Sequence, residues 1–302
     1  MYKFGLSCLK FKRRGGVESY VLSLVNGFNQ QNIDFNIYCD IVICGGNHKG
    51  FIKATNKKKK FYDNLKIAQE QKTYNSSKAI IAHSELMKNE LIELYQVPED
   101  KIKVIYPPID SEAFYIRDDN ERLKLREKYN FSKEKIYFLF PSTGHKRKGF
   151  ELLAEYFNKS NLPIELVVVG SEIDKKYEKY KNIRELGFSN TMSELYSCVD
   201  FTIMASIYEP FGLVAVESIL CGTPVVMSDN MACTEVFNHQ SGITFDRSRQ
   251  DSLDIAIKQA VNRVKVGQGR IDNPLNALEY DPSLSKHIED IITVVDQIKS
   301  VR

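Results

Sequence analysis

Short apolar runs alternate with longer amphipathic segments along almost the whole chain of 302 residues. The runs at 79–82, 136–140 and 166–169 are apolar throughout, as in strands that are buried on both faces of a parallel sheet. The segments at 17–28 and 253–266 repeat apolar residues at helical spacing. Two more helices are expected, one after the run at 79–82 with Ser84 as its cap and one from about Gly212 to Leu220. This alternation predicts an α/β protein in which helices cover both faces of parallel sheets.

The length allows two domains of ordinary size, and the proline-containing segment at 106–116 is the natural junction. We expect a short first domain at 1–108, completed by a terminal helix at about 285–302, and a second domain at 109–284. Each is expected to be a Rossmann-like, doubly wound unit. Ligands bind such units beyond the carboxyl ends of the strands, so functional residues should directly follow strands.

The charge of the chain restricts its partners. The formal net charge is only +3, which does not indicate a nucleic-acid binder. The first 110 residues nevertheless carry 17 Lys and Arg against 11 Asp and Glu, largely through residues 10–14 and 57–60. This surplus predicts either an ordinary solvated surface or contact with an anionic lipid or acceptor.

Cysteine usage and hydropathy indicate a cytoplasmic protein. The six cysteines form no C-x-x-C pair and several lie in strand-like runs, so we expect small buried side chains and neither a metal site nor a disulfide framework. No apolar run approaches the roughly 20 residues that cross a bilayer, and the N-terminus lacks the apolar core of a signal peptide. Peripheral contact with the inner membrane would be compatible with this composition.

The stretch YEPFGLVAVES at 208–218 carries the most specific chemistry. It follows the strand-like FTIMAS, and the CGTP after it is typical of a helix end. Gly212 allows close approach of the backbone, and the N–H groups of Gly212, Leu213 and Val214 form an anion site at the helix start. Glu217, one turn into the helix, can accept two hydrogen bonds from a vicinal diol such as a ribose. Glu209, before the helix, can hold the hydroxyls of a second ring.

This stretch resembles the E-x7-E motif of the retaining glycosyltransferases of family 4, with Glu209 and Glu217 in the two glutamate positions. The flanking EPFGLVAVES and CGTPVV are also similar to that family. The resemblance implies the GT-B fold, in which two Rossmann-like domains face each other across a cleft. The first domain would then serve the acceptor, and the second would bind the nucleotide sugar.

The stretch STGHKRKGFELLAEYF at 142–157 resembles the phosphate loop of the same family. Arg147 and Lys148 are therefore candidates for neutralising the diphosphate of the donor, against the alternative of a solvated basic cluster. The Arg that usually stands five residues before the Lys is Thr143 here, and the adjacent Arg147 would replace it. The RKG sequence is most similar to the lipopolysaccharide-core glucosyltransferase branch. His145 would touch donor or acceptor.

The resemblance implies further contacts in both halves of the chain. PEDKIKVIYPPIDSEAF at 98–114 resembles the hinge segment of the family. His48, in CGGNHKGF, is similar to the histidine that faces the donor sugar. Gly15 and Gly16 resemble the N-terminal glycine loop, with a simple tight turn as the alternative. The remaining positions expected to contact the nucleotide sugar are Gly144, Gly170, Leu186 and Phe211.

The family implies transfer of a hexose from a nucleoside diphosphate sugar, UDP-linked in our interpretation, with retention at the anomeric carbon. The mechanism is front-face attack, in which the protein supplies positioning and charge stabilisation. No metal or cofactor is expected, since cationic side chains and a helix start face the diphosphate. The expected partners are the nucleotide sugar and a cell-envelope glycan or glycolipid such as lipopolysaccharide core.

One departure from the family concerns the first half. On the order of 50 residues are missing between NIYCD and IVICGG, judged against ordinary element lengths. The alternative function is therefore a non-catalytic protein that binds nucleotide sugars with a truncated acceptor domain. An epimerase or a phosphorylase of the same architecture is disfavoured, because neither acid/base residues nor a cofactor-linked lysine is evident. The sequence leaves the donor sugar, base, acceptor, linkage and oligomeric state open.

Overall fold

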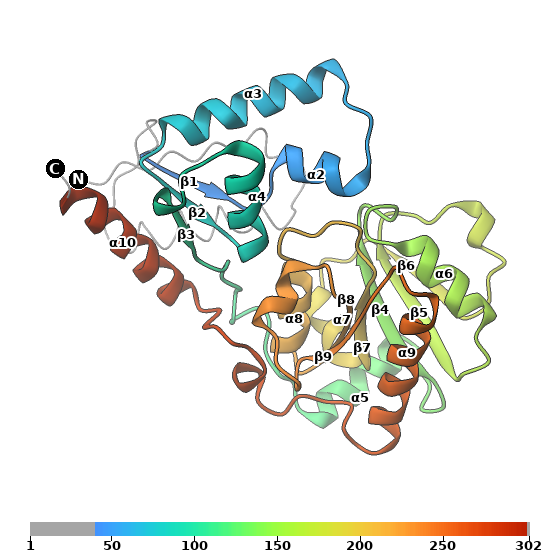
Figure 1. Ribbon diagram of the computed structural model, residues 1–302. Helices are drawn as coiled ribbons and strands as arrows, with labels where there is room; N and C mark the ends of the chain where they lie inside the picture. Colours follow the sequence, from blue (N-terminus) through green and yellow to red (C-terminus); the bar gives the residue numbers. More distant parts are fainter. Residues whose placement is uncertain (1–39, 301–302) are drawn as a thin grey trace. The chain divides into compact units, whose positions relative to one another are not determined.

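The computed structural model describes residues 40–300, apart from the side chains of residues 250 and 299. These residues divide into two compact units (Figure 1). Unit 1 contains residues 40–110 and 280–300, and unit 2 contains residues 111–279. The sequence-based boundaries were 108/109 and 284/285.

The described part of unit 1 is built on a three-stranded parallel sheet in the order β1-β2-β3. The strands are short, and helices or a turn connect each one to the next, as parallel pairing requires. In chain order the elements are β1 (Ile41–Cys44), α2 (His48–Thr55), α3 (Phe61–Ser76), β2 (Ala79–Ala82), α4 (Glu85–Tyr95), the 3-10 turn Glu99–Lys101, β3 (Ile102–Val104) and α10 (Leu284–Ser300).

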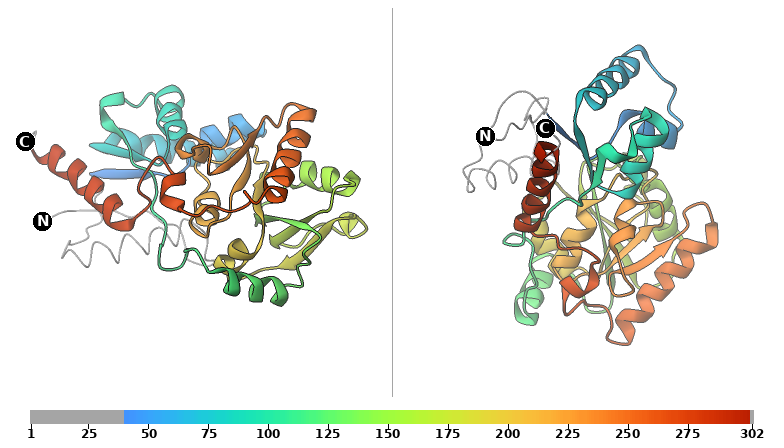
Figure 2. Two further views of the ribbon diagram at one scale, coloured as in Figure 1. Left: turned by 90° about the horizontal axis from the view of Figure 1, so that it is seen from below. Right: turned by 60° about the vertical axis from the view of Figure 1, so that its left-hand side comes forward.

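Helix α10 comes from the far end of the chain and packs on this sheet, as both Figure 1 and Figure 2 show. Its buried face, which includes Ile288 and Ile291, meets Ile41 and Ile81 of the strands. Removal of this apolar area from water favours the packing by about 25 cal/mol per Å². The three described strands therefore obtain part of their cover from a segment that is remote from them in the sequence.

Helix α4 begins with a side-chain N-cap. The Ser84 side chain accepts a hydrogen bond from the Met87 N–H at 3.1 Å, which satisfies one of the free donors of the first turn. The sequence predicts Ser84 as the cap of this helix, and the structure confirms it.

Unit 2 is a doubly wound domain with a six-stranded parallel sheet in the order β6-β5-β4-β7-β8-β9. Its strands are β4 (Ile136–Ser142), β5 (Ile164–Gly170), β6 (Ile183–Gly187), β7 (Phe201–Met204), β8 (Val225–Ser228) and β9 (Gly242–Phe245). Its α-helices are α5 (Asp119–Lys128), α6 (Phe150–Lys159), α7 (Met192–Cys198), α8 (Leu213–Leu220) and α9 (Gln250–Lys265). Three 3-10 turns, Lys175–Tyr177, Ala232–Val236 and Pro274–Ala277, lie between them.

Alternate residues of the central strand β4 serve two separate cores. Tyr137 and Leu139 belong to a buried cluster with residues of β5 and α7. Phe138 points to the other face, where its ring lies 5.4 Å from that of Phe157 on α6. Every residue of β4 is buried, which explains its continuous apolar run. The predicted α/β class with parallel sheets is confirmed.

The strand order reverses at β4. The chain passes from β4 to β5 on one side and later returns to place β7 on the other side of β4. The loops after β4 and β7 therefore leave neighbouring strand ends at the switch point of the sheet, which is where doubly wound domains bind ligands. These two loops contain the predicted phosphate loop and the first glutamate.

The four cysteines in the described part of the chain are free and buried: Cys44, Cys198, Cys221 and Cys233. This confirms for these residues the expectation of small buried side chains, while Cys8 and Cys39 lie outside the described residues. Among the described residues, no helix is both long and apolar enough to span a bilayer.

Candidate functional site

The loop after β4 is fastened to the loop after β7 by main-chain hydrogen bonds. The Ile207 N–H donates to the Arg147 carbonyl at 2.8 Å, and the Ala205 N–H donates to the Lys148 carbonyl at 3.3 Å. Gly149 has φ +78°, and a Cβ on it would stand 1.9 Å from the Ala205 carbonyl oxygen. Only glycine fits this close crossing of two backbones. The phosphate-loop residues and the glutamate loop are therefore held together at the point where the strand order reverses.

Arg147 is oriented by the glutamate loop. Its Nη1 donates to Oε2 of Glu209 at 2.8 Å and to the Tyr208 carbonyl at 2.6 Å. The Arg147 side chain remains 32% exposed, while that of Glu209 is 14% exposed. Both contacts use one nitrogen, so within residues 40–300 the other guanidinium N–H groups are not engaged by hydrogen bonds. The pair thus leaves a half-buried cation with donors to spare.

Lys148 is held against the end of β4, where its Nζ donates to the Pro141 carbonyl at 3.0 Å. Burial lowers the pKa of the Lys148 ammonium, and Arg147 lowers it further. The carboxylates of Glu209 and Glu217 oppose that shift. Both predicted glutamates therefore act electrostatically on one ammonium group, and a bound anion would stabilise its charged form.

Glu217 lies within α8 and accepts a hydrogen bond at Oε2 from the Tyr196 hydroxyl, at 2.9 Å. Burial raises the pKa of Glu217, while the Tyr196 hydroxyl and Lys148 both act to lower it. Tyr196 is itself buried in the cluster that packs α7 on the sheet, and burial raises its pKa well above the usual value. Tyr196 was not singled out from the sequence. The available signal was a phenol hydroxyl among the buried residues of α7.

The start of α8 has the form expected of an anion site. Gly212 precedes the helix with φ +106°, and in the described part of the chain no side chain caps its first turn. A Cβ on Gly212 would approach Cys233 Sγ and Met231 Cε, each at 3.2 Å, and the Glu209 side chain at 3.3 Å. The predicted helix from about Gly212 to Leu220 is confirmed, with Gly222 in a left-handed conformation just past its end.

Other predicted residues lie around the same strand ends. Gly170, at the end of β5, has φ +128°, and a Cβ there would stand 2.1 Å from the Ser142 carbonyl oxygen of β4. Gly144 has open space around its Cα. Leu186 packs against the buried cluster beneath the sheet, and Phe211 is buried beside the glutamate loop. Gly15 and Gly16 lie outside the described residues.

His145 is engaged in holding the phosphate loop together. Its Nδ1 lies 2.9 Å from the Ser142 hydroxyl, and its Nε2 lies 2.8 Å from the Ser171 carbonyl. Since a carbonyl can only accept, Nε2 carries a proton. The ring also packs 5.1 Å from that of Phe150. These contacts tie the loop after β4 to the loop after β5.

His48 lies in unit 1, at the start of α2 and directly after β1. Its Nε2 is 2.8 Å from Oδ1 of the buried Asp63, and its main-chain N–H donates to the Glu70 carboxylate at 3.1 Å. Lys57 Nζ and the Lys60 N–H also donate to Asp63, at 2.8 and 2.7 Å, and the pKa of Asp63 is well below its usual range because of these donors. An ionised Asp63 therefore fixes the orientation of the His48 ring.

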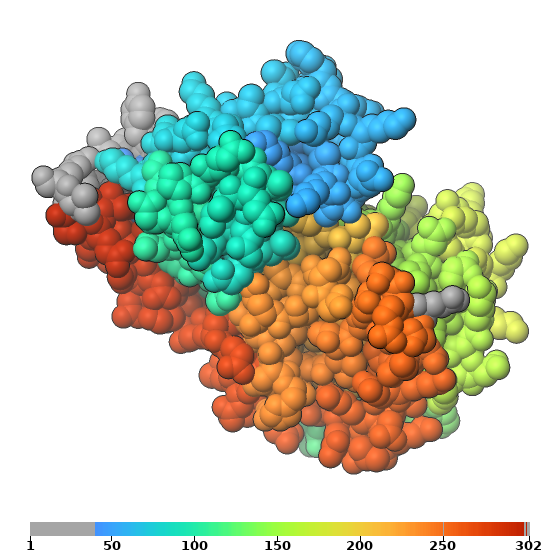
Figure 3. Space-filling model, viewed as in Figure 1, coloured from blue at the N-terminus to red at the C-terminus, as the bar shows by residue number. Residues whose placement is uncertain are grey.

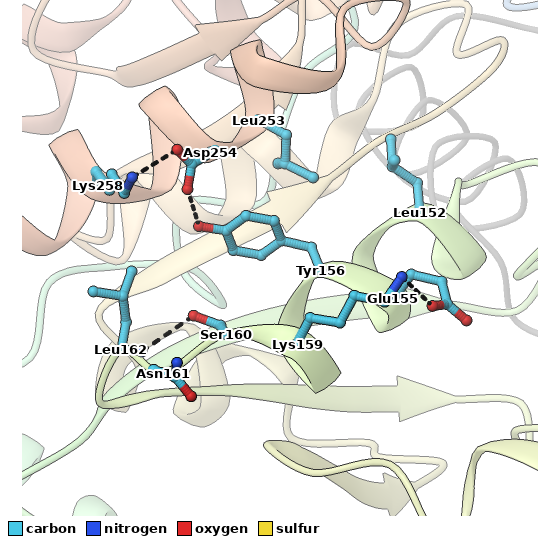
Figure 4. Close-up of a pocket in the computed structure, with 10 residues that line it drawn as sticks. All are labelled: Leu152, Glu155, Tyr156, Lys159, Ser160, Asn161, Leu162, Leu253, Asp254 and Lys258. Carbon is cyan, nitrogen blue, oxygen red and sulfur yellow. Dashed lines mark hydrogen bonds and ion pairs between the residues drawn. The ribbon is translucent and has the colours of Figure 1, made fainter.

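A separate pocket of about 580 Å³ lies between α6 and α9 of unit 2. Figure 4 shows the Tyr156 ring reaching toward α9, where its hydroxyl donates to Asp254 at 3.0 Å. Lys258 pairs with the same carboxylate at 2.8 Å, and Lys159 pairs with Glu155 at 3.2 Å. The charged groups of this pocket are therefore paired with one another. The segment 160–162 that lines it leads into the amino end of β5, away from the loops that hold Arg147 and Glu209.

Comparison with known proteins gives the class. A model of the glycosyl transferases group 1 matches residues 121–266, and a model of glycosyltransferase family 4 matches residues 39–113. A probable transglycosylase of Burkholderia thailandensis is 34% identical over 266 residues, which are 87% of this chain and 72% of the relative. The chain belongs to the group 1 glycosyltransferases.

A more distant relative is an uncharacterized glycosyltransferase of Methanocaldococcus jannaschii. It is 32% identical over 195 residues, which are 60% of this chain but only 50% of the relative. The chain therefore spans about three quarters of the length of one curated relative and half of the other.

Solved structures support the fold. The Anabaena protein HepE, in complex with UDP and glucose, superposes with a TM-score of 0.71 at 16% identity over 93% of this chain and 76% of that chain. WaaG, a glycosyltransferase involved in lipopolysaccharide biosynthesis, superposes with a TM-score of 0.66 at 18% identity over 87% and 79% of the two chains. The predicted GT-B class, with two Rossmann-like units, is confirmed.

Proposed function

We propose that this protein transfers a hexose from a nucleoside diphosphate sugar, linked to UDP, to a cell-envelope glycan, with retention at the anomeric carbon. One observation carries the proposal: Arg147, Lys148 and both glutamates gather beside the strand ends where the strand order of unit 2 reverses. Sites of this type bind nucleotides in doubly wound domains. The UDP complex of the HepE structure supports a uridine nucleotide as the donor.

Each group has a proposed role in donor binding. Glu217 accepts the two ribose hydroxyls with the lone pairs that Tyr196 leaves free. The unused N–H groups of Arg147, the Lys148 ammonium and the start of α8 bind the diphosphate. Glu209, already oriented by Arg147, binds the hydroxyls of the donor sugar.

The proposed reaction breaks the bond between the anomeric carbon and the diphosphate and forms a bond from the same carbon to an acceptor hydroxyl. The acceptor proton passes to the departing diphosphate. Negative charge grows on that diphosphate in the transition state, where Arg147, Lys148 and the α8 N–H groups stabilise it. We propose that these groups stabilise the charge on the diphosphate without a metal ion. His48 is assigned to the donor sugar, with Asp63 holding its ring.

We propose a glycan of the lipopolysaccharide class as the acceptor. The support is the structural similarity to WaaG, whose described role is in lipopolysaccharide biosynthesis, together with the RKG loop at 147–149.

Calorimetric titration of the full chain with UDP, UDP-glucose, GDP and GDP-mannose tests the donor site. We expect micromolar binding of the uridine compounds that Glu217→Gln weakens by about tenfold or more, since one charged hydrogen-bond acceptor is lost. Glu178→Gln changes an exposed carboxylate of the same unit and should leave binding intact. Absence of binding to all four compounds would contradict the proposal.

Turnover separates an enzyme from a protein that only binds nucleotide sugars. The full chain would be incubated with radiolabelled UDP-glucose and truncated lipopolysaccharide, and transfer would be measured beside donor hydrolysis. Binding with no transfer to any envelope glycan would favour the non-catalytic alternative.

A further inference from the structure

The pocket between α6 and α9 has the size of a ligand site and shares no residue with the groups proposed to bind the donor. Its volume of about 580 Å³ lies in the range of about 300–1,000 Å³ that is usual for small-molecule sites. Helix α6 packs on β5 and β6, whereas α9 packs on β8 and β9, toward the opposite edge of the sheet. A hollow is therefore left between the two helices, and Figure 3 shows the orange surface of α9 beside the yellow-green surface of α6.

One part of this pocket is apolar. Leu152 and Leu162 are half-buried in its wall, and Leu253 is buried there. The ring of Tyr156, also half-buried, extends from α6 toward α9 with the three leucines around it (Figure 4). A ring with aliphatic neighbours provides a surface on which the C–H groups of a ligand can pack.

The polar part of the pocket carries no net charge. It contains two carboxylates and two ammonium groups, which pair one turn apart on each helix, Glu155 with Lys159 and Asp254 with Lys258. These four side chains are at least 40% exposed, and ion pairs with such exposure contribute little to stability. A neutral ligand can therefore replace part of this pairing at little cost, whereas a charged ligand meets repulsion from groups of its own sign.

Both carboxylates are ionised acceptors with lone pairs to spare. The pKa of Asp254 is lowered chiefly by the hydrogen bond from Lys258, and that of Glu155 by the hydrogen bond from the Tyr180 hydroxyl. Each of the four carboxylate oxygens accepts one hydrogen bond or pairs with one ammonium group within residues 40–300, so each keeps a second lone pair. Acceptors and N–H donors thus lie side by side, as suits a hydroxyl group, which both donates and accepts.

We propose that this pocket binds a neutral oligosaccharide, with the C–H face of one pyranose against the Tyr156 ring and the hydroxyl groups on Glu155 and Asp254. A pyranose combines an apolar face with a rim of hydroxyls, which are the two kinds of surface that the pocket offers. A nucleotide or a sugar phosphate would bring negative charge beside both carboxylates, and an apolar peptide would remove them from water without hydrogen bonds.

A second point of attachment would raise the local concentration of a long glycan near the enzyme. This use of the pocket rests on the proposed function, whereas the binding of the oligosaccharide does not.

Saturation-transfer difference NMR tests the site on the full chain with four neutral trisaccharides: maltotriose, isomaltotriose, cellotriose and mannotriose. Excess UDP is added to occupy the donor site. We expect at least one trisaccharide to bind, and Tyr156→Ser to weaken that binding by about tenfold or more, because a ring contact is lost. Tyr156→Phe should bind within about threefold of the parent, because the ring remains. Tyr115→Ser removes a half-exposed tyrosine elsewhere in unit 2 and should leave binding unchanged.

A double variant tests the polar part of the pocket. Glu155→Gln/Asp254→Asn should weaken trisaccharide binding by about tenfold or more, because two charged acceptors are lost. The matched control is Glu178→Gln/Asp272→Asn, which changes two exposed carboxylates outside the pocket. Circular dichroism and UDP titration verify that each variant keeps its fold and its donor site.

Two results would overturn the proposal. One is the absence of binding for all four trisaccharides, and the other is binding that both Tyr156→Ser and Glu155→Gln/Asp254→Asn retain. Failure of the parent protein to bind UDP would bear on the donor site alone. Loss of the trisaccharide from pocket variants that still bind UDP would support the pocket, so the two failures are distinguishable.

Discussion

At the scale of the residue, the Glu217 carboxylate is the group whose function conflicts with its environment. Burial raises its pKa above the ordinary 4.5, so the folded state favours the protonated form more than the unfolded state does. The stability contribution of this group is therefore present at low pH and is lost as the pH rises from 4.5 through the folded-state pKa.

Glu217→Gln should consequently raise the melting temperature relative to the parent at pH 7.5, with a smaller difference near pH 4, while it weakens UDP binding. Differential scanning calorimetry at the two pH values measures this. Equal effects at both pH values would show that the carboxylate carries no burial cost.

Tyr196 controls the same titration. Its hydroxyl lowers the pKa of Glu217 through the 2.9 Å hydrogen bond, so Tyr196→Phe should raise that pKa further. If the ionised carboxylate binds ribose, UDP affinity falls as the pH falls through this pKa. In Tyr196→Phe the decline in UDP affinity should begin at a higher pH. The same variant should lose about 1 kcal/mol of unfolding free energy, because the hydrogen bond to Glu217 is absent. Titrations with UDP between pH 5 and 8 would test it, and an unshifted profile would remove Tyr196 from the site.

At the scale of the element, Gly149 joins the phosphate loop to β7. Gly149→Ala must place a Cβ within 1.9 Å of the Ala205 carbonyl oxygen at a positive φ, so we expect a loss of about 3 kcal/mol from unit 2 in urea unfolding. Gly144→Ala is the matched control in the same loop, since a Cβ there meets nothing within 4 Å. If both variants unfold at the same urea concentration, the two loops are not rigidly held together.

Elements with a clear apolar pattern were predictable, and those without one were not. The strands β4 and β5, the helix α8 and the Ser84 cap were predicted correctly, whereas α2, α5 and β9 were not found. Helix α5 has almost no apolar stripe, because it is attached through ion pairs: Arg122 and Arg126 reach the Asp200 carboxylate at 2.9 and 3.1 Å. Such polar attachment leaves no periodicity in the sequence. The capping pair Asp118 and Glu121 was its one local signal.

The residues of the site also divide into those that the sequence predicts and those that it does not. The two glutamates and the basic loop were predictable because their local context is distinctive. The Arg147–Glu209 pair joins residues that are 62 positions apart, and the Tyr196–Glu217 bond joins residues 21 apart. The order of the strands in the sheet brings these groups together. The spacing of the residues along the chain therefore does not predict these contacts.

At the scale of the whole molecule, the two units differ in how the chain builds them. Unit 2 is one continuous segment, Ser111–Glu279, whereas unit 1 needs α10 from the end of the chain. All the hydrogen bonds described around Arg147, Lys148, Glu209 and Glu217 lie within unit 2. The groups proposed to bind the nucleotide are therefore contained in a segment of a size that can fold by itself, whereas His48, which is assigned to the donor sugar, belongs to unit 1.

A fragment of residues 111–279 should consequently fold cooperatively and bind UDP within about tenfold of the affinity of the full chain. A chain ending at residue 280 should keep that binding, but its first unit should lose protection from hydrogen exchange. Without α10, apolar side chains of that sheet, including Ile41, Ile81 and Ile105, become exposed to water. Exchange measured by mass spectrometry distinguishes the units. A folded fragment that does not bind UDP would show that residues of unit 1 supply essential contacts, and the donor site would then have to be redrawn to include them.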